Sequence, residues 1–112
     1  MERGEIRWVS LSAPNASEPG YRRPVVIVQS NKFNQSNINT VLCVAISSNL
    51  SLANAPGNVR VSAKSTGLSK PSVINVSQLI TIDRRYISEK VRLLDMSIMN
   101  QVEDGLRLIL GL

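Results

Sequence analysis

Hydrophobic residues, many of them β-branched, occur along the chain in short runs separated by polar segments. Three of these runs are predicted to be strands: Ile6–Leu11, Pro24–Gln29 and Thr40–Ser47. The second and third are almost continuously apolar, which is typical of strands in the centre of a sheet. The segments between them, Ser12–Tyr21 and Ser30–Asn39, are rich in Ser, Asn, Pro and Gly and are predicted to be loops.

Weaker strand patterns follow in the second half of the chain. Asn58–Ala63 and Ser72–Val76 are predicted to be shorter strands, and Gln78–Ile82 is expected to continue the second of them. A turn of helix is expected around Arg84–Ile87. The pattern therefore predicts five strands joined by polar loops.

Near the C-terminus the apolar positions have a helical period instead. Spacings of three, four and three residues place four apolar side chains on one helical face: Met99, Val102, Leu106 and Ile109. Asp95 is the predicted N-cap, and Gly111 is predicted to end the helix. We therefore predict one α+β domain, residues 1–112. Its strands form a bent antiparallel sheet or small half-open SH3-like barrel, with the C-terminal helix packed on it.

The composition excludes several kinds of chemistry. The chain has no His and a single Cys, so His-dependent triads, His-ligated metals and Cys-based zinc sites are excluded. Cys43 lies inside an apolar strand and is predicted to be an inert, packed thiol. No cofactor or metal is expected. No apolar run approaches the ~20 residues that span a bilayer, so we expect no membrane contact and a cytoplasmic location.

Charge is unevenly distributed along the chain. Thirteen Lys and Arg residues against eight Asp and Glu give a net charge of +5, which suits a polyanionic partner. No acid occurs between Pro19 and Ile82. That stretch carries six cations, which are expected to form a positive face or, alternatively, to be scattered solvated side chains: Arg22, Arg23, Lys32, Arg60, Lys64 and Lys70.

Several short motifs are spread over almost the whole chain: Arg3-Gly4-Glu5-Ile6, Ser17-Glu18, Arg23-Pro24 and the strand to Gln29, Phe33-Asn34, Val44-Ala45-Ile46-Ser47, Gly67-Leu68, Ser72, Gln78, Thr81-Ile82-Asp83 and the closing Leu110-Gly111-Leu112. In their order and spacing these motifs resemble the MazF/PemK family of toxin endoribonucleases. The resemblance implies the fold of the MazF, PemK and CcdB toxins. It also implies a homodimer that cuts single-stranded RNA without metal and is inhibited by an antitoxin whose C-terminal segment occupies the RNA channel.

Metal-free RNA cleavage uses the neighbouring 2′-OH as nucleophile and leaves a 2′,3′-cyclic phosphate and a 5′-OH. It needs a group that accepts the 2′ proton, a group that protonates the leaving oxygen, and a cation that stabilises charge on the phosphorane. Without His, the loops and strand ends near the positive stretch supply only four candidates: Glu18, Arg22, Arg23 and Ser47.

Three of these residues are predicted to be catalytic. Arg23 matches the Arg-Pro arginine of the family and is assigned charge stabilisation, with proton donation as a further role. Ser47 is expected to donate a hydrogen bond to the scissile phosphate, or else to cap its own backbone, and the neighbouring Ser48 is the alternative hydroxyl. Glu18 is expected either to act as general base or to hold Arg23 in place.

Other residues are predicted to bind RNA without taking part in the reaction. Tyr21 is the favoured residue for stacking on a base, and Arg22, pointing away from Arg23, is assigned an auxiliary phosphate contact. Trp8, within a strand, is expected to lie in the core. The full set of predicted RNA contacts is Ser17, Tyr21, Arg22, Ser48 and Gln78.

Two other functions compete with RNA cleavage. Plasmid-encoded poisons of DNA gyrase are related in architecture, but they bind through a C-terminal tail containing Trp, and this chain ends in Ile109-Leu110-Gly111-Leu112. The second rival is a relic that binds RNA or antitoxin and has lost its nuclease activity. The resemblance implies a cognate antitoxin, and the charge distribution predicts that this inhibitor is acidic where it binds.

Overall fold

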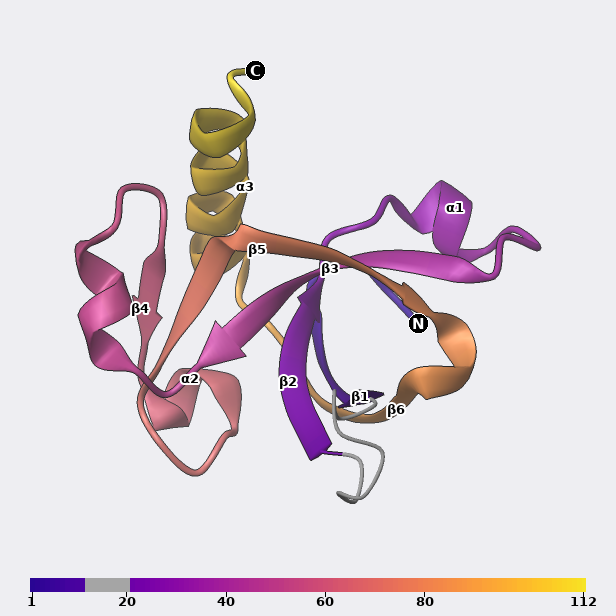
Figure 1. Ribbon diagram of the computed structural model, residues 1–112, viewed down its shortest axis with the longest axis horizontal. Helices are drawn as coiled ribbons and strands as arrows, with labels where there is room; N and C mark the ends of the chain where they lie inside the picture. Colours follow the sequence, from indigo (N-terminus) through magenta and orange to yellow (C-terminus); the bar gives the residue numbers. More distant parts are fainter. Residues whose placement is uncertain (12–20) are drawn as a thin grey trace.

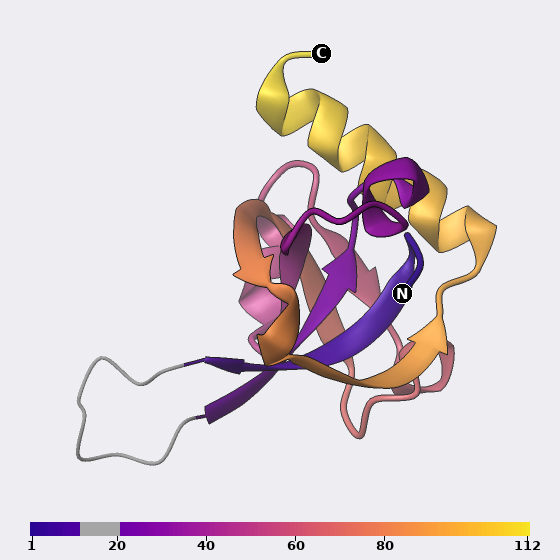
Figure 2. The same ribbon diagram turned by 90° about the vertical axis from the view of Figure 1, so that its right-hand side faces the viewer.

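The computed structural model describes residues 1–11 and 21–112. Its main element is a single curled sheet (Figures 1 and 2). In these residues six strands pair antiparallel, in the spatial order β4-β5-β3-β2-β1-β6. Their bounds are β1 Glu5–Leu11, β2 Tyr21–Ile27, β3 Thr40–Ser47, β4 Val59–Val61, β5 Ser72–Asp83 and β6 Ile87–Leu93. This is the α+β class with a bent antiparallel sheet that the sequence predicts.

The sixth strand is absent from the sequence prediction, which contains five strands. β6 carries the sequence ISEKVRL and pairs with β1 at the edge of the sheet. Most of its side chains are exposed, and edge strands tolerate charges that central strands exclude. The prediction was wrong here because an edge strand of this kind lacks the apolar run that marks the central ones.

Irregular pairing bends the sheet. Along β3 the partner on β5 jumps from Leu79, opposite Val44, to Asn75, opposite Ala45. Extra residues on one strand bend it and increase its local twist. The predicted continuation of Ser72–Val76 into Gln78–Ile82 is confirmed, since both segments belong to β5, and the irregularity lies between them.

The C-terminal helix α3, Met96–Leu110, packs on one face of the sheet (Figure 2). Asp95 occupies the N-cap position, although its side chain makes no capping hydrogen bond, and Gly111 ends the helix with φ of 71°. Met99 and Val102 are buried as predicted. Ile109, in the same helix, is half exposed.

Apolar residues lie on both faces of the sheet. The larger cluster joins the sheet to α3 through residues such as Ile6, Val26 and Met99. The second cluster, on the opposite face, contains Val9, Val25, Ile27, Val41, Cys43 and Ile82. Burial raises the pKa of the Cys43 thiol to about 12, so this side chain is protonated at neutral pH and inert, as predicted.

Short helices occupy segments outside the strands. They are α1 Asn31–Asn34, the 3-10 turn η1 Leu50–Asn54, α2 Ala63–Thr66 and the 3-10 turn η2 Arg84–Tyr86. The last corresponds to the turn of helix expected around Arg84–Ile87. In the described part of the chain, no helix is long and apolar enough to cross a membrane.

Candidate active site

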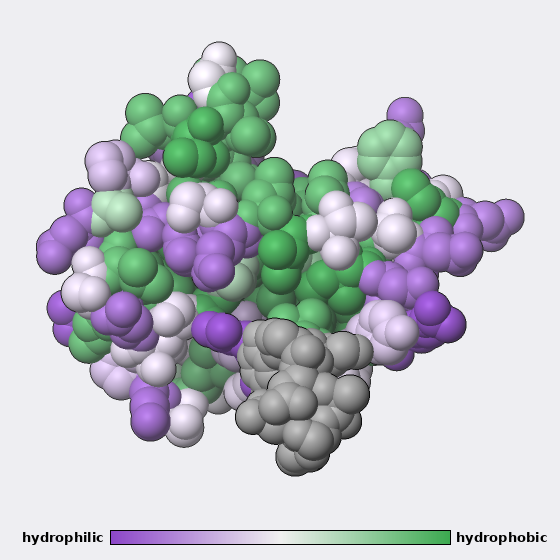
Figure 3. Space-filling view, viewed as in Figure 1, coloured by the Kyte–Doolittle hydropathy of each residue, from purple (hydrophilic) through white to green (hydrophobic). Residues whose placement is uncertain are grey.

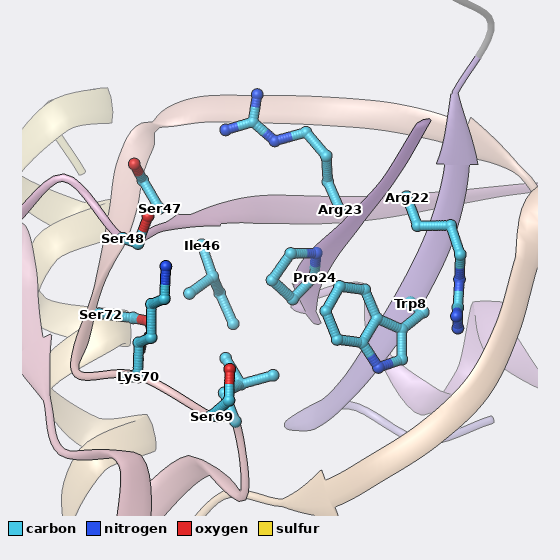
Figure 4. Close-up of a pocket in the computed structure, with 11 residues that line it drawn as sticks. Trp8, Arg22, Arg23, Pro24, Ile46, Ser47, Ser48, Ser69, Lys70 and Ser72 are labelled. Atoms are coloured by element: carbon cyan, nitrogen blue, oxygen red, sulfur yellow. Dashed lines mark hydrogen bonds between the residues drawn. The ribbon is translucent and has the colours of Figure 1, made fainter. Parts of the chain in front are cut away.

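A pocket of about 270 Å³ lies where β1, β2 and β3 meet the segment between α2 and β5 (Figure 4). Eleven residues line it: Trp8, Arg22, Arg23, Pro24, Ile46, Ser47, Ser48, Leu68, Ser69, Lys70 and Ser72. Three of them are cations, and none of the described lining residues is an acid. The pocket is therefore suited to an anionic group.

Arg23 and Ser47 come from neighbouring strands and line the same pocket. The pairing of β2 with β3 reaches Val25 and Ala45, and Arg23 and Ser47 each lie two residues beyond this pair. Both side chains line the pocket, on the rim above Pro24 and Ile46 (Figure 4). Two of the residues predicted to be catalytic, separated by 24 positions in the sequence, are thus neighbours in the fold.

The position of the Ser47 hydroxyl is compatible with both roles expected from the sequence, which are capping of the local backbone and donation of a hydrogen bond to a phosphate. Its oxygen accepts a hydrogen bond from the Asn49 backbone N–H at 3.1 Å. A hydroxyl that accepts one bond still has its own hydrogen to donate, and Ser47 lines the pocket. Ser48 lines the same pocket and is more exposed, so the structure brings both hydroxyls to the site.

Lys70 supplies a cation from the segment between α2 and β5, although the sequence analysis assigns it no role in the site. It follows α2 in the chain, and its backbone carbonyl accepts a hydrogen bond from the buried Ser72 hydroxyl at 3.1 Å. Figure 4 shows its ammonium group on the same side of the pocket as Ser47 and Ser48. The available signal was its position in the acid-free stretch, which did not distinguish it from Lys32 or Lys64.

Arg22 points away from Arg23, as alternation along β2 predicts, but it contacts protein groups. Its guanidinium carbon lies 5.0 Å from the centroid of the Trp8 ring, and its Nη2 lies 3.2 Å from Oε2 of Glu89 on β6.

The prediction that Trp8 lies in the core was wrong, because this side chain is only partly buried and forms one wall of the pocket. β6 also brings an acid to the region that the charge pattern had suggested to be free of acids.

Gln78 is near Arg23, on a second and smaller hollow of about 130 Å³. Arg23 lines both hollows. The Gln78 side-chain oxygen accepts a hydrogen bond from the Asn75 amide at 3.2 Å, within the irregular part of β5. Arg23 and Gln78 therefore line the same hollow.

Three predicted site groups lie outside the described part of the structure. They are Ser17, Glu18 and the side chain of Tyr21, although the Tyr21 backbone begins β2 and pairs with Leu11. Within residues 1–11 and 21–112, no group of three or more Cys, Asp or Glu lies close enough together to hold a metal ion.

Comparison with known proteins covers the chain from end to end. Residues 2–110 match the family described as the PemK-like, MazF-like toxin of type II toxin-antitoxin systems. Over 112 residues the chain is 39% identical to the endoribonuclease MazF6 of Mycobacterium tuberculosis, covering 100% of this chain and 98% of the relative. It is 32% identical to the endoribonuclease EndoA of Bacillus subtilis, covering 100% and 96% of the two chains.

Solved structures share the fold. An endoribonuclease in complex with its cognate antitoxin, from a mycobacterial species, superposes with a TM-score of 0.82 at 18% identity and covers 100% of this chain and 96% of its own. The MazE–MazF structure from Deinococcus radiodurans gives a TM-score of 0.83 at 19% identity, with the same coverage. The curled sheet with its C-terminal helix is thus the fold of these toxins, and the fold prediction is confirmed. With the match over residues 2–110 and the identity to its relatives, this chain belongs to the PemK/MazF-like toxin family of type II toxin-antitoxin systems.

Proposed function

We propose that this protein is a cytoplasmic toxin that cleaves single-stranded RNA, including mRNA, in a metal-independent reaction. Membership of the toxin family and the endoribonuclease names of the relatives support the enzyme class. One observation supports the assignment of the site: Arg23 on β2 and Ser47 on the neighbouring strand β3 line the same basic pocket.

The proposed reaction is an in-line displacement at phosphorus. The 2′-oxygen of one nucleotide attacks, the 5′-oxygen of the next nucleotide leaves, and the products carry a 2′,3′-cyclic phosphate and a 5′-OH. Negative charge grows on the phosphorane oxygens in the transition state. Donors that are already in position at that point lower the barrier, because they need no reorganisation.

Arg23 is placed to stabilise this charge. Its backbone is held in β2 immediately before Pro24, and a guanidinium offers two parallel N–H donors to a pair of phosphate oxygens. Ser47 donates its hydroxyl hydrogen to the same phosphate, and Lys70, which lines the same pocket, adds a second positive charge. Arg23 is also the candidate donor of the proton that the leaving oxygen takes.

The segment with Ser17 and Glu18 completes the proposed site on the basis of the sequence. Glu18 either accepts the 2′ proton or pairs with Arg23 and orients it. Ser17, Tyr21, Ser48 and Gln78 contact the RNA around the scissile bond. These roles follow from the family resemblance and from the position of each residue in the sequence.

A homodimer and an antitoxin complete the proposal. Exposed apolar side chains gather on the C-terminal part of α3 and on the sheet beside it (Figure 3), including Leu108, Leu110 and Leu42. Such a surface favours association with a second copy of the chain.

Antitoxins are present in the two solved toxin structures compared above. We propose a cognate antitoxin whose acidic segment occupies the basic pocket.

Sequencing of the cleavage products tests the proposed function. Purified protein is incubated with a long RNA, the new 5′ ends are mapped, and an oligonucleotide containing the preferred site is then made with a single 2′-deoxy substitution at the nucleotide that supplies the nucleophile. Cleavage of the all-ribose oligonucleotide and no cleavage of the substituted one is the expected result. Cleavage of both would exclude 2′-OH attack. Binding without any cleavage would identify a relic, and inhibition of DNA gyrase without cleavage would identify the rival toxin function.

A further inference from the structure

Trp8, the single tryptophan of the chain, is partly buried, and it contacts Arg22 and lines the pocket. On one side the Arg22 guanidinium lies 5.0 Å from the ring centroid. On the other, Trp8 lines the pocket that also contains Arg23 and Ser47. Figure 4 shows Arg22 on the side of the indole that is away from Ser47 and Lys70.

Arg22 is itself held by Glu89. Its Nη2 lies 3.2 Å from Oε2 of Glu89, and the two side chains come from β2 and β6, on either side of β1, which carries Trp8. One side chain from each of three neighbouring strands therefore forms a layered group, which we call the Trp8 stack: Glu89, Arg22 and Trp8. The planar guanidinium suits this position, because it can stack on a ring and bind a carboxylate in its own plane at the same time.

We propose that Trp8 is a stacking platform for one unpaired nucleobase of the RNA, and that Arg22 and Glu89 are positioning residues that hold the indole in place. This inference rests on the proposed function, because it places the base beside the phosphate bound by Arg23 and Ser47. A pocket of about 270 Å³ accommodates a planar base. Lys70 and the serines on the opposite wall offer donors to the carbonyl oxygens of that base.

The alternative role for Arg22 is the auxiliary phosphate contact expected from the sequence, and the two roles predict opposite effects of losing Glu89. If Arg22 binds phosphate, removing the carboxylate frees a cation and strengthens RNA binding. If Arg22 positions Trp8, the same change loosens the platform and weakens base-dependent binding. The direction of the change therefore decides between them.

Tryptophan fluorescence gives a direct readout, because the signal comes from Trp8 alone. The probes are a thymidine hexamer, which lacks the 2′-OH and is not cleaved, and an abasic hexamer with the same number of phosphates. We expect the thymidine hexamer to quench the fluorescence and to bind more tightly than the abasic one. A stacked base is worth about 1–3 kcal/mol, which corresponds to about 5-fold to 150-fold in affinity. Equal quenching and equal affinity for the two probes would overturn the proposal.

Two matched variants test the positioning role. Glu89→Gln and Asp104→Asn each remove one exposed, ion-paired carboxylate, with side chains 72% and 78% exposed, but Asp104 lies on α3 and pairs with Arg107. We expect Glu89→Gln to weaken binding of the thymidine hexamer about 2-fold to 5-fold relative to Asp104→Asn, the scale of an exposed ion pair. Tighter binding by Glu89→Gln, for the thymidine and abasic hexamers alike, would assign Arg22 to phosphate instead.

Substitution of Trp8 itself tests whether the aromatic ring is needed for discrimination between the two hexamers. Trp8→Phe keeps an aromatic ring and should retain most of the discrimination between the two hexamers, whereas Trp8→Leu keeps an apolar side chain and should lose it. With cleavable RNA we expect the loss to fall mainly on KM rather than kcat. An enzyme that cleaves RNA but shows no base-dependent quenching refutes the platform alone, whereas a protein that does not cleave RNA refutes the proposed function.

Discussion

Arg23 is the residue on which the proposed chemistry depends most. It lies within β2, where it pairs with Val9 on β1, and its side chain lines both hollows of the site, the larger of which it shares with Ser47. We predict that Arg23→Ala lowers the cleavage rate about 10²-fold or more, the scale of losing a preorganised charge stabiliser. Single-turnover rates on a defined oligonucleotide measure this effect.

Arg85→Ala is the matched control for that experiment. Arg85 is an exposed arginine on η2, where it pairs with Asp83, and it does not line the pocket. The control should cleave at close to the rate of the unmodified protein, and both variants should unfold at similar temperatures. If Arg23→Ala cleaves as fast as Arg85→Ala, the site assignment is wrong.

The environment of Glu5 leads us to predict that the free energy of unfolding falls at acidic pH. Its carboxylate is almost fully buried and contacts Arg7 at 3.0 Å and Lys90 at 3.4 Å. Burial by itself would raise its pKa, but hydrogen bonds from the Glu2 backbone and from Arg7, together with the charge of Arg7, lower the pKa below its ordinary value of 4.5. The stabilisation is therefore complete above pH 4.5 and is lost as pH falls through the lower pKa of the folded protein.

Urea unfolding at a series of pH values, with Glu5→Gln alongside, measures this contribution. We expect the stability difference between the unmodified protein and Glu5→Gln to shrink as the pH is lowered from about 5 to 3, across the titration range of a carboxylate. A difference that stays constant over this range would contradict the lowered pKa.

Two residues that line the pocket, Arg23 and Ser47, could be singled out from the sequence, whereas their surroundings could not. Arg23 and Ser47 are recognisable because each ends or begins an apolar strand at a position that the family marks. Trp8 and Glu89 are not recognisable in this way, because their roles depend on which strands are neighbours and on how the sheet is curled. Alternation along β1 indicates two faces, but it does not indicate that one end of a face opens into a pocket.

At the scale of elements, apolar patterns identified the central strands and the long helix but not the edge of the sheet. β3 has the predicted bounds, and α3 lies between the predicted capping residues. β6 and the four-residue helix α1 were not predicted, because the first is mostly exposed and lacks a continuous apolar run, and the second is too short for a helical period to appear.

The helix α3 and the loop before β4 lie so close together that only glycine fits at position 105, although glycine weakens a helix. A Cβ atom at Gly105 would lie 2.1 Å from the carbonyl oxygen of Gly57 and 3.2 Å from a methyl group of Val76. Alanine is favoured over glycine in a helix by about 1 kcal/mol, but here the clash dominates. We predict that Gly105→Ala lowers the free energy of unfolding by about 1–3 kcal/mol, the usual cost of overpacking, as measured by chemical denaturation.

Asn100→Ala is the control, because Asn100 is exposed on the same helix. That substitution should change the free energy of unfolding by no more than about 0.5 kcal/mol. A Gly105→Ala variant as stable as this control would show that the helix does not need to approach Gly57 so closely.

At the scale of the whole molecule, the exposed apolar end of α3 bears on assembly. Leu108 and Leu110 are 62% and 52% exposed in the single chain, and green side chains continue from them onto the sheet in Figure 3. We predict a homodimer at micromolar concentration, because covering this surface removes apolar area from water. Light scattering should give about twice the chain mass of 12.3 kDa. A mass close to that of one chain would contradict the prediction.

Cleavage of a long RNA by the purified protein in excess EDTA, with chemical analysis of both new ends, is the most direct test of metal-free catalysis by this fold. Without His and with one buried Cys, the chain lacks the residues that most often hold a catalytic transition metal. We expect the cleavage rate to be the same with and without EDTA, and the products to carry a 2′,3′-cyclic phosphate and a 5′-OH. Loss of cleavage on chelation, restored by added magnesium, would contradict the account.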